Sequence, residues 1–404
     1  MNHKMRKLFA ILLMVFLLIS SSYSYYGING IDNLAYVLAI GLDVGDNNTL
    51  NLSLQISMPN NSEGGSSSSQ SSSSVVDSVE CSSINSGISL FNSYLGKEVN
   101  LSHCKVLVIS EELATKGISE YLYTLSNNTE FRTDSNIIIS KCDAKTFLEY
   151  STPVLDKVSA RYYEIAPTSS EYTGYTESIT CNEFLTSIID TYSEPVAILG
   201  SVNIKSTQKS SQDSSYTAGE TPISGNNGVE TMGLAVFNED KLVGELNGLE
   251  SICHLIISNK LKNAQIRIPS PIQELDYIDL YIELDKSVRP ILYLTNSSPY
   301  IISDIKITAK MQSMNENIDL KDDSIKAKIE QAAQNYLEQN LYNYLYKTSK
   351  ELHADIDNFG LYALKYFSTT AEWENFNWLH RYKDSFFKVS VDVNLSSSYL
   401  LTNT

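Results

Sequence analysis

Basic residues are scarce in this chain of 404 residues, which has 30 lysines and arginines against 47 aspartates and glutamates and a net charge of −17. Phosphate groups are bound mainly by lysine and arginine, so an acidic surface repels them. The composition therefore excludes nucleic acid as a partner and a polybasic patch for anionic lipid headgroups. The plainest interpretation of the charge is a well-solvated surface.

Cysteine is also scarce, and its five residues make an odd number without any CxxC spacing. Disulfide frameworks in exported domains use dense, even-numbered cysteines. No framework is expected here, and a single fortuitous bridge is the alternative. Cys104 and Cys253 lie in apolar stretches and are interpreted as small buried residues. The other cysteines are Cys81, Cys142 and Cys181.

The sequence lacks the motifs of catalysis and metal binding, including HExxH, EF-hand spacing and a Gly-rich phosphate loop. His103 stands beside Cys104, but neighbours on a strand point to opposite faces, which favours packing over a catalytic dyad. Ser206 and Lys209 spell SxxK without its partner motifs. We therefore expect no catalytic, cofactor-binding or metal-binding residues, and no enzyme.

Acidic residues at the starts of helices or turns are the next candidates for chemistry. They are Glu111, Glu112, Asp355 and Asp357. Carboxylates are favoured at such positions because they complement the helix dipole and its unpaired N–H groups. We interpret all four as capping residues, and we expect the NEDK segment, residues 238–241, to form a turn.

Tryptophan occurs only twice, at Trp373 and Trp378, with Phe376 between them. Such a group is typical of an exposed anchor for a protein partner. It is equally typical of packing in the core of the last domain. The sequence leaves both interpretations open.

Only one long apolar run is present, LFAILLMVFLLI over residues 8–19, and it follows three basic residues. Crossing about 30 Å of hydrocarbon takes roughly 20 residues, so this run has the length of a signal-peptide core. Cleavage after Ser24 is one expectation for residues 1–24. An uncleaved membrane anchor, extended by tyrosines into the interface, is the other. Both place residues 25–404 outside the cytoplasm.

The length predicts two or three domains, since about 150 residues form a typical one. We expect an N-terminal region over residues 25–205, divided into two subdomains and carrying a Ser-rich loop at 60–74. Residues 206–230 lack an apolar period and are expected to be a flexible linker. Residues 231–404 then form the C-terminal region.

In the N-terminal region, alternating apolar residues predict a hairpin of strands 36–43 and 50–58. The segments that follow alternate between helix and strand, which predicts parallel pairing. They are helices over 75–95 and 111–125 and strands over 106–110, 137–140 and 197–204.

In the C-terminal region, the clearest element is a helix over 324–352, whose apolar residues recur at three and four positions. Ser324 is its expected N-cap. The other expected elements are strands 233–237, 241–246, 264–268, 276–284, 291–295, 305–311 and 387–395 and a helix over 248–261. The sequence thus predicts an α+β fold of several domains, with mixed sheets and a C-terminal sheet packed by one long helix.

Three blocks carry a resemblance to a known family. They are IDNLAYVLAIGLDVG at residues 31–45, GLAVFNEDKLVGELNG at 233–248 and ADIDNFGLYALKYF at 354–367, the last continued by WENFNWLHRYKDSFFKVSVDVNL. HCKVLVISEELATKGISEYL lies between the first two blocks. In this order and spacing the chain resembles the Ger(x)C family, the C subunits of nutrient germinant receptors in endospore-forming bacteria.

The resemblance implies an exported, non-catalytic subunit that assembles with two multipass membrane subunits, of A and B type, and with the membrane surface. It places the protein at the outer face of the spore inner membrane, where the receptor turns nutrient detection into germination. The partner subunits are where the nutrient would bind, and no cofactor is implied. The alternative is a stand-alone extracytoplasmic solute-binding protein.

The chain departs from this family at its lipidation site. The family's lipobox cysteine stands nine residues before the leucine that matches Leu34, and Tyr25 occupies that position here. No cysteine precedes Cys81, so an N-terminal thioether lipid cannot form. We therefore expect a non-lipidated variant, held by its apolar N-terminal segment or by its partners.

Overall fold

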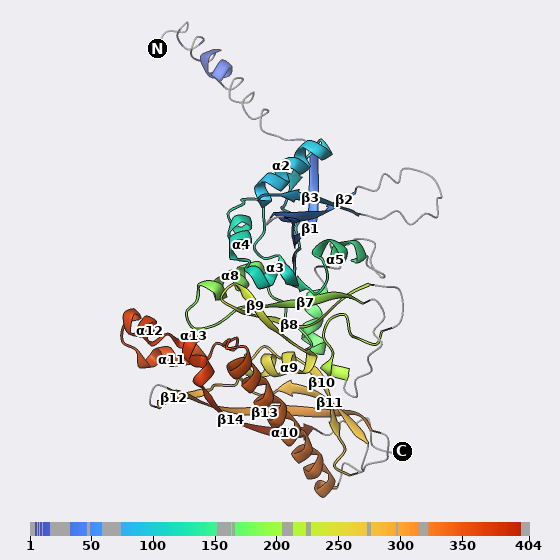
Figure 1. Cartoon of the computed structure of the whole chain (residues 1–404), viewed down its shortest axis with the longest axis vertical. Helices are drawn as coiled ribbons and strands as arrows, with labels where there is room; N and C mark the ends of the chain where they lie inside the picture. The colour runs from blue at the N-terminus through green and yellow to red at the C-terminus, as the bar shows by residue number, and fades with distance from the viewer. Residues whose placement is uncertain are drawn as a thin grey trace, which may run out of the picture.

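The structure is a computed structural model (Figure 1), and it describes residues 5, 7, 9, 11–16, 33–46, 49–58, 74–151, 163, 166–203, 213–223, 228–272, 276–295, 298–314 and 322–396. Three predictions fall outside these residues: the export signal's cleavage site with Tyr25, most of the Ser-rich loop, and the SxxK pair. No helix among the described residues is long and apolar enough to span a bilayer.

A nine-stranded mixed sheet forms the upper part of the molecule in Figure 1. Its order is β3-β2-β1-β5-β6-β7-β8-β9, and β4 pairs with β1. The strands are β1 (Leu34–Val44), β2 (Leu50–Ser57), β3 (Ser74–Cys81), β4 (Glu98–Asn100), β5 (Val106–Ser110), β6 (Asn136–Ser140), β7 (Val196–Asn203), β8 (Gly228–Asn238) and β9 (Lys241–Leu246).

The centre of this sheet confirms the predicted parallel pairing, because β1 with β5, β5 with β6, and β6 with β7 all run parallel. All five residues of β5 are buried, as expected for an apolar strand covered on both faces. The hairpin of β1 and β2 is antiparallel, as predicted.

The helices of this part of the chain are short. They are α2 (Ile84–Leu95), α3 (Glu111–Lys116), α4 (Ser119–Ser126), α5 (Ala144–Tyr150), α7 (Ser170–Thr173) and α8 (Cys181–Ile189), with 3-10 turns η3 (Ala166–Ser169) and η4 (Asp213–Ser215). Of these, α2, α3, α5 and α8 contact strands of the first sheet, whereas α7 contacts β10 (Ala264–Pro269), a strand of the second sheet. The sequence did not predict α5 or α8.

Two helix predictions in this region were wrong in extent. The predicted helix 75–95 begins only at Ile84, because the β-branched residues before it pair with β2 as strand β3. The predicted helix 111–125 is broken at Gly117, whose φ of 113° lies in the region that favours glycine. Asp240 lies against Gly117, and its carboxylate accepts a hydrogen bond from the N–H of Ser119 at the start of α4.

Strands β8 and β9, expected with the C-terminal region, belong instead to the first sheet. β8 pairs antiparallel with β7 across the segment that the sequence suggested as a linker. Within that segment Tyr216 and Ala218 are buried, and residues 228–230 are part of β8. The described residues of the segment 206–230 are therefore packed structure rather than a flexible connection. The N-terminal subdomain division stays a prediction.

The second sheet has five strands: β10 (Ala264–Pro269), β11 (Tyr277–Leu284), β12 (Ile291–Thr295), β13 (Ser298–Met314) and β14 (Phe386–Ser396). Both β12 and β14 pair with residues 300–302 of β13, and both β11 and β14 pair with residues 307–310. β14 therefore occupies one edge of β13, and β11 and β12 follow each other along the opposite edge.

Helices of the C-terminal part lie between and beside the two sheets. They are α9 (Gly248–Ile257), α10 (Asp323–Tyr346), α11 (Phe359–Ala363), α12 (Thr370–Phe376) and α13 (Trp378–Arg381), with a π turn η5 (Lys347–Glu351) and 3-10 turns η6 (Leu364–Tyr366) and η7 (Tyr382–Asp384). Each of α9 and α12 begins with a full capping box.

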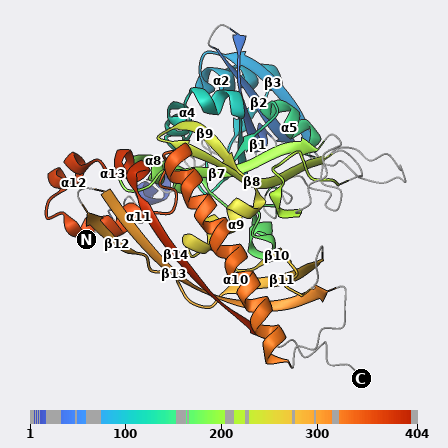
Figure 2. The same cartoon turned by 60° about the horizontal axis from the view of Figure 1, so that its bottom comes forward.

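The long helix lies across the second sheet and packs mainly on β14 (Figure 2). Leu337 and Leu341 of this helix are fully buried. The predicted span 324–352 corresponds to α10 and the π turn after it, but the N-cap is Asp322, whose carboxylate accepts the N–H of Ser324 at 2.9 Å. The prediction of Ser324 as the cap was therefore wrong by two residues.

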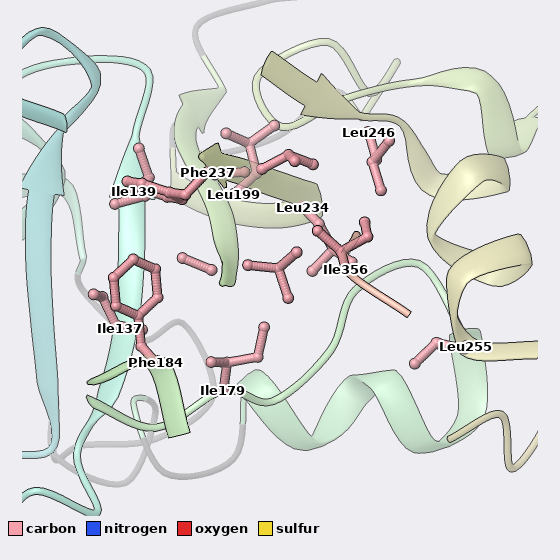
Figure 3. Packing of buried hydrophobic residues seen from close by; sticks show 14 of the residues in the cluster. Ile137, Ile139, Ile179, Phe184, Leu199, Leu234, Phe237, Leu246, Leu255 and Ile356 are labelled. Atoms are coloured by element: carbon pink, nitrogen blue, oxygen red, sulfur yellow. The ribbon is translucent and has the colours of Figure 1, made fainter. Parts of the chain in front are cut away.

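One hydrophobic core connects both parts of the molecule. Figure 3 shows Ile356, from the loop before α11, among Leu234 and Leu246 of the first sheet and near Leu255 of α9. The α+β fold with a C-terminal sheet packed by one long helix is as predicted, but its two sheets share this core.

Candidate functional site

A group of polar side chains is buried where α9, α10 and the loop 352–358 meet the first sheet. We call this group the polar junction: Glu177, Glu194, His254, Tyr344, Asp355 and Asp357. Buried polar groups are costly unless they are hydrogen-bonded or paired. The arrangement of these partners therefore decides what the junction can do.

His254 lies at the centre of the junction and is fully buried. Its Nδ1 is 2.9 Å from Asp357 Oδ1, and its Nε2 is 2.9 Å from Glu177 Oε2. Burial lowers the pKa of His254, but the hydrogen bonds and charges of these two carboxylates outweigh it and raise the pKa to about 9. The imidazole is therefore protonated at neutral pH, and both nitrogens donate hydrogen bonds.

Glu177 bridges His254 and Lys260, whose ammonium contacts its Oε1. Burial raises the pKa of Glu177, but the hydrogen bond and charge of His254, with those of Lys260, outweigh it and hold the pKa below its usual value. The two cations His254 and Lys260 thus balance the two anions Glu177 and Asp357.

Asp357 has a second partner on α10. The hydroxyl of Tyr344 donates to its carboxylate at 2.8–2.9 Å and lies 3.1 Å from His254 Nδ1. Burial and the negative charge of Asp357 raise the pKa of Tyr344 well above its ordinary value, so the phenol stays a donor. One carboxylate therefore fastens α9 to α10.

Asp355 performs a different task in the same loop. Its carboxylate accepts the N–H groups of Phe359 and Gly360 at the start of α11, at 3.2 and 2.9 Å. It also accepts the indole N–H of Trp378 at 2.8 Å. A Cβ on Gly360 would lie 2.5 Å from the backbone oxygen of Tyr192 and 2.7 Å from Trp378, so only glycine allows this close approach.

Glu194 connects the junction to the first sheet. Its N–H donates to the carbonyl of Asp355 at 2.7 Å, and its Oε2 accepts the N–H of Glu239 in the β8–β9 turn at 2.7 Å. Glu239 has a left-handed φ of 55°, which this hydrogen bond helps to hold. Burial raises the pKa of Glu194 to about 7, and burial with the nearby charge of Asp357 raises that of Asp355 to about 7.

The structure decides between the two interpretations of the tryptophans. Trp373 and Trp378 are 4% and 1% exposed, and their rings stack with centroids 6.2 Å apart. Trp373 donates its indole N–H to Thr191 at 2.7 Å. The pair is packed core that attaches α12 and α13 to the N-terminal part, and it is not an exposed anchor.

The capping interpretation is confirmed for Asp355, which accepts N–H groups at the start of α11. Glu111 and Glu112 stand in the first turn of α3, where the helix dipole favours carboxylates, and Glu112 pairs with Lys116. For Asp357 the interpretation was wrong, because its carboxylate binds His254 and Tyr344 instead. The NEDK segment is the turn between β8 and β9, as expected.

Sequence reasoning missed His254 and Glu177 altogether. A signal was present for His254, since it is a titratable residue inside a helix whose residues 248–249 and 251–257 are all buried. Such a residue needs partners. No comparable signal marked Glu177. His103 is exposed while Cys104 is buried, and all five cysteines are free thiols.

The polar junction is a set of ion pairs whose charges balance, and it connects segments that are distant in the sequence. Within the described parts of the chain, no group of three His, Cys, Asp or Glu side chains is placed to hold a metal ion. Both nitrogens of His254 are engaged by carboxylates. The geometry suits a structural role that responds to protonation.

Comparisons with known proteins agree with the blocks noted in the sequence. Residues 28–202 match the family model of the spore germination protein N-terminal domain, and residues 232–399 match the model described as spore germination B3/GerAC like, C-terminal. Spore germination protein KC of Bacillus subtilis (strain 168) is 24% identical over 351 residues, 85% of this chain and 83% of that protein. A solved structure, the crystal structure of the GerBC protein, is 12% identical with a TM-score of 0.49, and the match covers 89% of this chain and 97% of that one.

Proposed function

The chain belongs to the GerAC-type family of spore germination proteins, and from this premise we propose that it is the exported, non-catalytic C subunit of a nutrient germinant receptor. In this role it assembles with multipass membrane subunits of A and B type, and the assembly triggers germination of the dormant spore. The observation that carries the proposal is the match of two germination-protein models, in order, over residues 28–202 and 232–399.

The polar junction supports the proposal that this subunit works without catalysis. Its carboxylates are engaged in ion pairs, caps and backbone hydrogen bonds. An activated nucleophile needs a base with a free hydrogen-bonding position, and both nitrogens of His254 are occupied. The family is one of receptor subunits rather than of known enzymes.

We place the protein at the outer face of the spore inner membrane. The apolar run at residues 8–19 behind three basic residues supports export. Because Tyr25 replaces the lipobox cysteine, attachment depends on an uncleaved apolar segment or on contacts with partner subunits. Family membership itself implies association with other receptor subunits.

Deletion of the gene tests the proposal. Mutant spores should form normally, fail to germinate with the nutrients that this receptor serves, and still germinate with calcium dipicolinate, which bypasses nutrient receptors. Normal germination with every nutrient that triggers the parent strain would contradict the proposed function.

A second candidate, a stand-alone solute-binding protein, is favoured by one observation, a polar cleft beside Glu194. The two functions are distinguished by purifying the tagged chain from spore membranes. A receptor subunit should bring multipass partners with it, whereas a solute-binding protein should purify alone and melt at a higher temperature with its solute.

A further inference from the structure

The outward face of the second sheet carries a cluster of apolar side chains where β12, β13 and β14 lie side by side. The strand registers place Tyr293, Tyr300 and Phe386 in one row across the three strands. Ile291 and Ile302 form the next row on β12 and β13. Residues opposite each other on neighbouring strands point to the same face of a sheet. We call these five residues the apolar patch.

The apolar patch is open to solvent. Phe386 is 62% exposed, Tyr293 is 50% exposed and Ile291 is 46% exposed, and the other two patch residues are half-buried. The alternate residues Leu292 and Ile301 point to the opposite face and are buried in the core. Single exposed apolar residues are common on protein surfaces, but a contiguous group of them marks a surface that another molecule covers.

The rest of this sheet face is charged, and most of its charges pair with one another. Three ion pairs join neighbouring strands: Arg267 with Asp279 and Lys310 with Glu283, each at 2.8 Å, and Lys306 with Asp392 at 3.9 Å. These pairs leave no excess of either sign. The face therefore differs from the chain as a whole, whose net charge is −17.

Two further charges of opposite sign border the apolar patch. Lys388 on β14 stands opposite Ile302, and Asp304 is two positions further along β13. Both side chains are exposed, and Asp304 accepts a hydrogen bond from the hydroxyl of Ser390. Among the residues that the structure describes, neither Lys388 nor Asp304 takes part in an ion pair of this face. One cation and one anion beside the patch are thus available to a partner.

This combination of features is self-complementary. A two-fold contact joins the same surface of two copies, so every contact between two different residues occurs twice. The two apolar patches can cover each other while Lys388 of each copy meets Asp304 of the other. Two chains of net charge −17 repel each other over most of their surface, and a face without excess charge is where they can approach. An anionic bilayer would instead be matched by cations alone.

We propose that the outward face of β12, β13 and β14 is an interface between two copies of this chain, formed by the apolar patch and by reciprocal pairs of Lys388 with Asp304. This contact of the chain with itself goes beyond the proposed assembly with membrane subunits. Germination phenotypes of a deletion strain test the receptor role separately.

Sedimentation velocity of the purified full-length protein tests the proposal. We expect the mass to change from that of one chain to that of two chains as the concentration rises to about 100 μM. A protein that keeps the mass of one chain over this range overturns the proposal. A single chain that binds phosphatidylglycerol vesicles through the patch would show that the surface contacts a membrane instead, and it also overturns the proposal.

Reversal of the two bordering charges tests the identity of the partner. Lys388→Glu and Asp304→Lys should each weaken the dimer at least about tenfold, because each brings like charges together in both halves of the contact. The double variant should dimerise within about threefold of the wild type. Only a contact between two copies of the same surface places the two changes opposite each other. Loss of the dimer in the double variant, or no loss in either single variant, refutes the assignment.

Two more variants complete the experiment. Lys116→Glu makes the same charge change at an exposed position of α3, beside the first sheet, and should dimerise within about twofold of the wild type. Phe386→Ser should weaken the dimer at least about tenfold, and thermal melting should show an intact fold, because its side chain is largely exposed. All variants keep the apolar run at residues 8–19, so association through that run would be equal in all of them and would contradict the proposed interface.

Discussion

The Nδ1 atom of His254 lies 2.9 Å from Asp357, 103 positions further along the chain. This pair joins α9, which follows the first sheet, to the loop that leads from α10 to α11. Because both side chains are fully buried, the pair is sensitive to the loss of either partner.

Asp357→Asn should destabilise the protein by about 3–5 kcal/mol, because it leaves the charge of His254 buried with only Glu177 as a partner. Urea denaturation of the full-length protein measures the change. Asp392→Asn is the control, since Asp392 has an exposed side chain 3.9 Å from Lys306 and should change stability by less than about 0.5 kcal/mol. Similar losses in the two variants would contradict a central role for the His254–Asp357 pair.

Stability should fall as the pH rises from about 5 to 9. Asp355 and Glu194 have folded-state pKa values of about 7, above their ordinary values of 3.8 and 4.5. Their contribution to the free energy of unfolding is therefore full below the ordinary values and is lost as the pH rises through 7. His254, raised from 6.5 to about 9, contributes fully below 6.5 and loses its contribution through pH 9.

The pH prediction is checked by urea denaturation at several pH values. The pKa of Glu177 is lowered, so its contribution to stability is lost only in acid. Measurements above about pH 5 therefore avoid the effect of this residue. Asp355→Asn should flatten the slope between about pH 5 and 7 and leave the fall toward pH 9 in place. A wild-type stability that rises from about pH 5 to 9 would show that these groups are not perturbed as described.

Leu337→Asp or Leu341→Asp should disrupt the packing of α10 in the core, because each places an unpaired charge in a fully buried site at a cost of several kcal/mol. Asn335→Ala and Gln339→Ala, on the exposed side, should change stability by less than about 0.5 kcal/mol.

Thermal melting compares these helix variants. The full-length chain is used instead of residues 231–404, because β8 and β9 complete the first sheet. Equal tolerance of the buried and exposed substitutions would mean that α10 does not bury its apolar face in the core.

The protein should incorporate no thiol-independent palmitate label in sporulating cells, because Tyr25 occupies the position of the lipobox cysteine. Tyr25→Cys together with a restored lipobox should create labelling and serves as the positive control. Label on the unaltered chain in a thiol-independent linkage would show that another route of lipidation operates.

The sequence by itself determined most of the local elements. Alternation predicted the β1–β2 hairpin, continuous apolar runs predicted β5 and β6, and the three-and-four spacing around Leu337 predicted the long helix. These patterns are visible because each depends on neighbours within a few positions. The break at Gly117 and the late start of α2 at Ile84 were missed because tertiary pairing overrides weak local preference.

Only the tertiary structure decided how the parts are joined. Pairing of β7 with β8 placed two expected C-terminal strands in the first sheet, and no local pattern records which sheet a strand enters. The same is true of the polar junction, where Glu177, His254 and Asp357 come from three separate segments. The charge balance that stabilises them exists only when all three are buried together, because a carboxylate in water needs no partner whereas a buried one does.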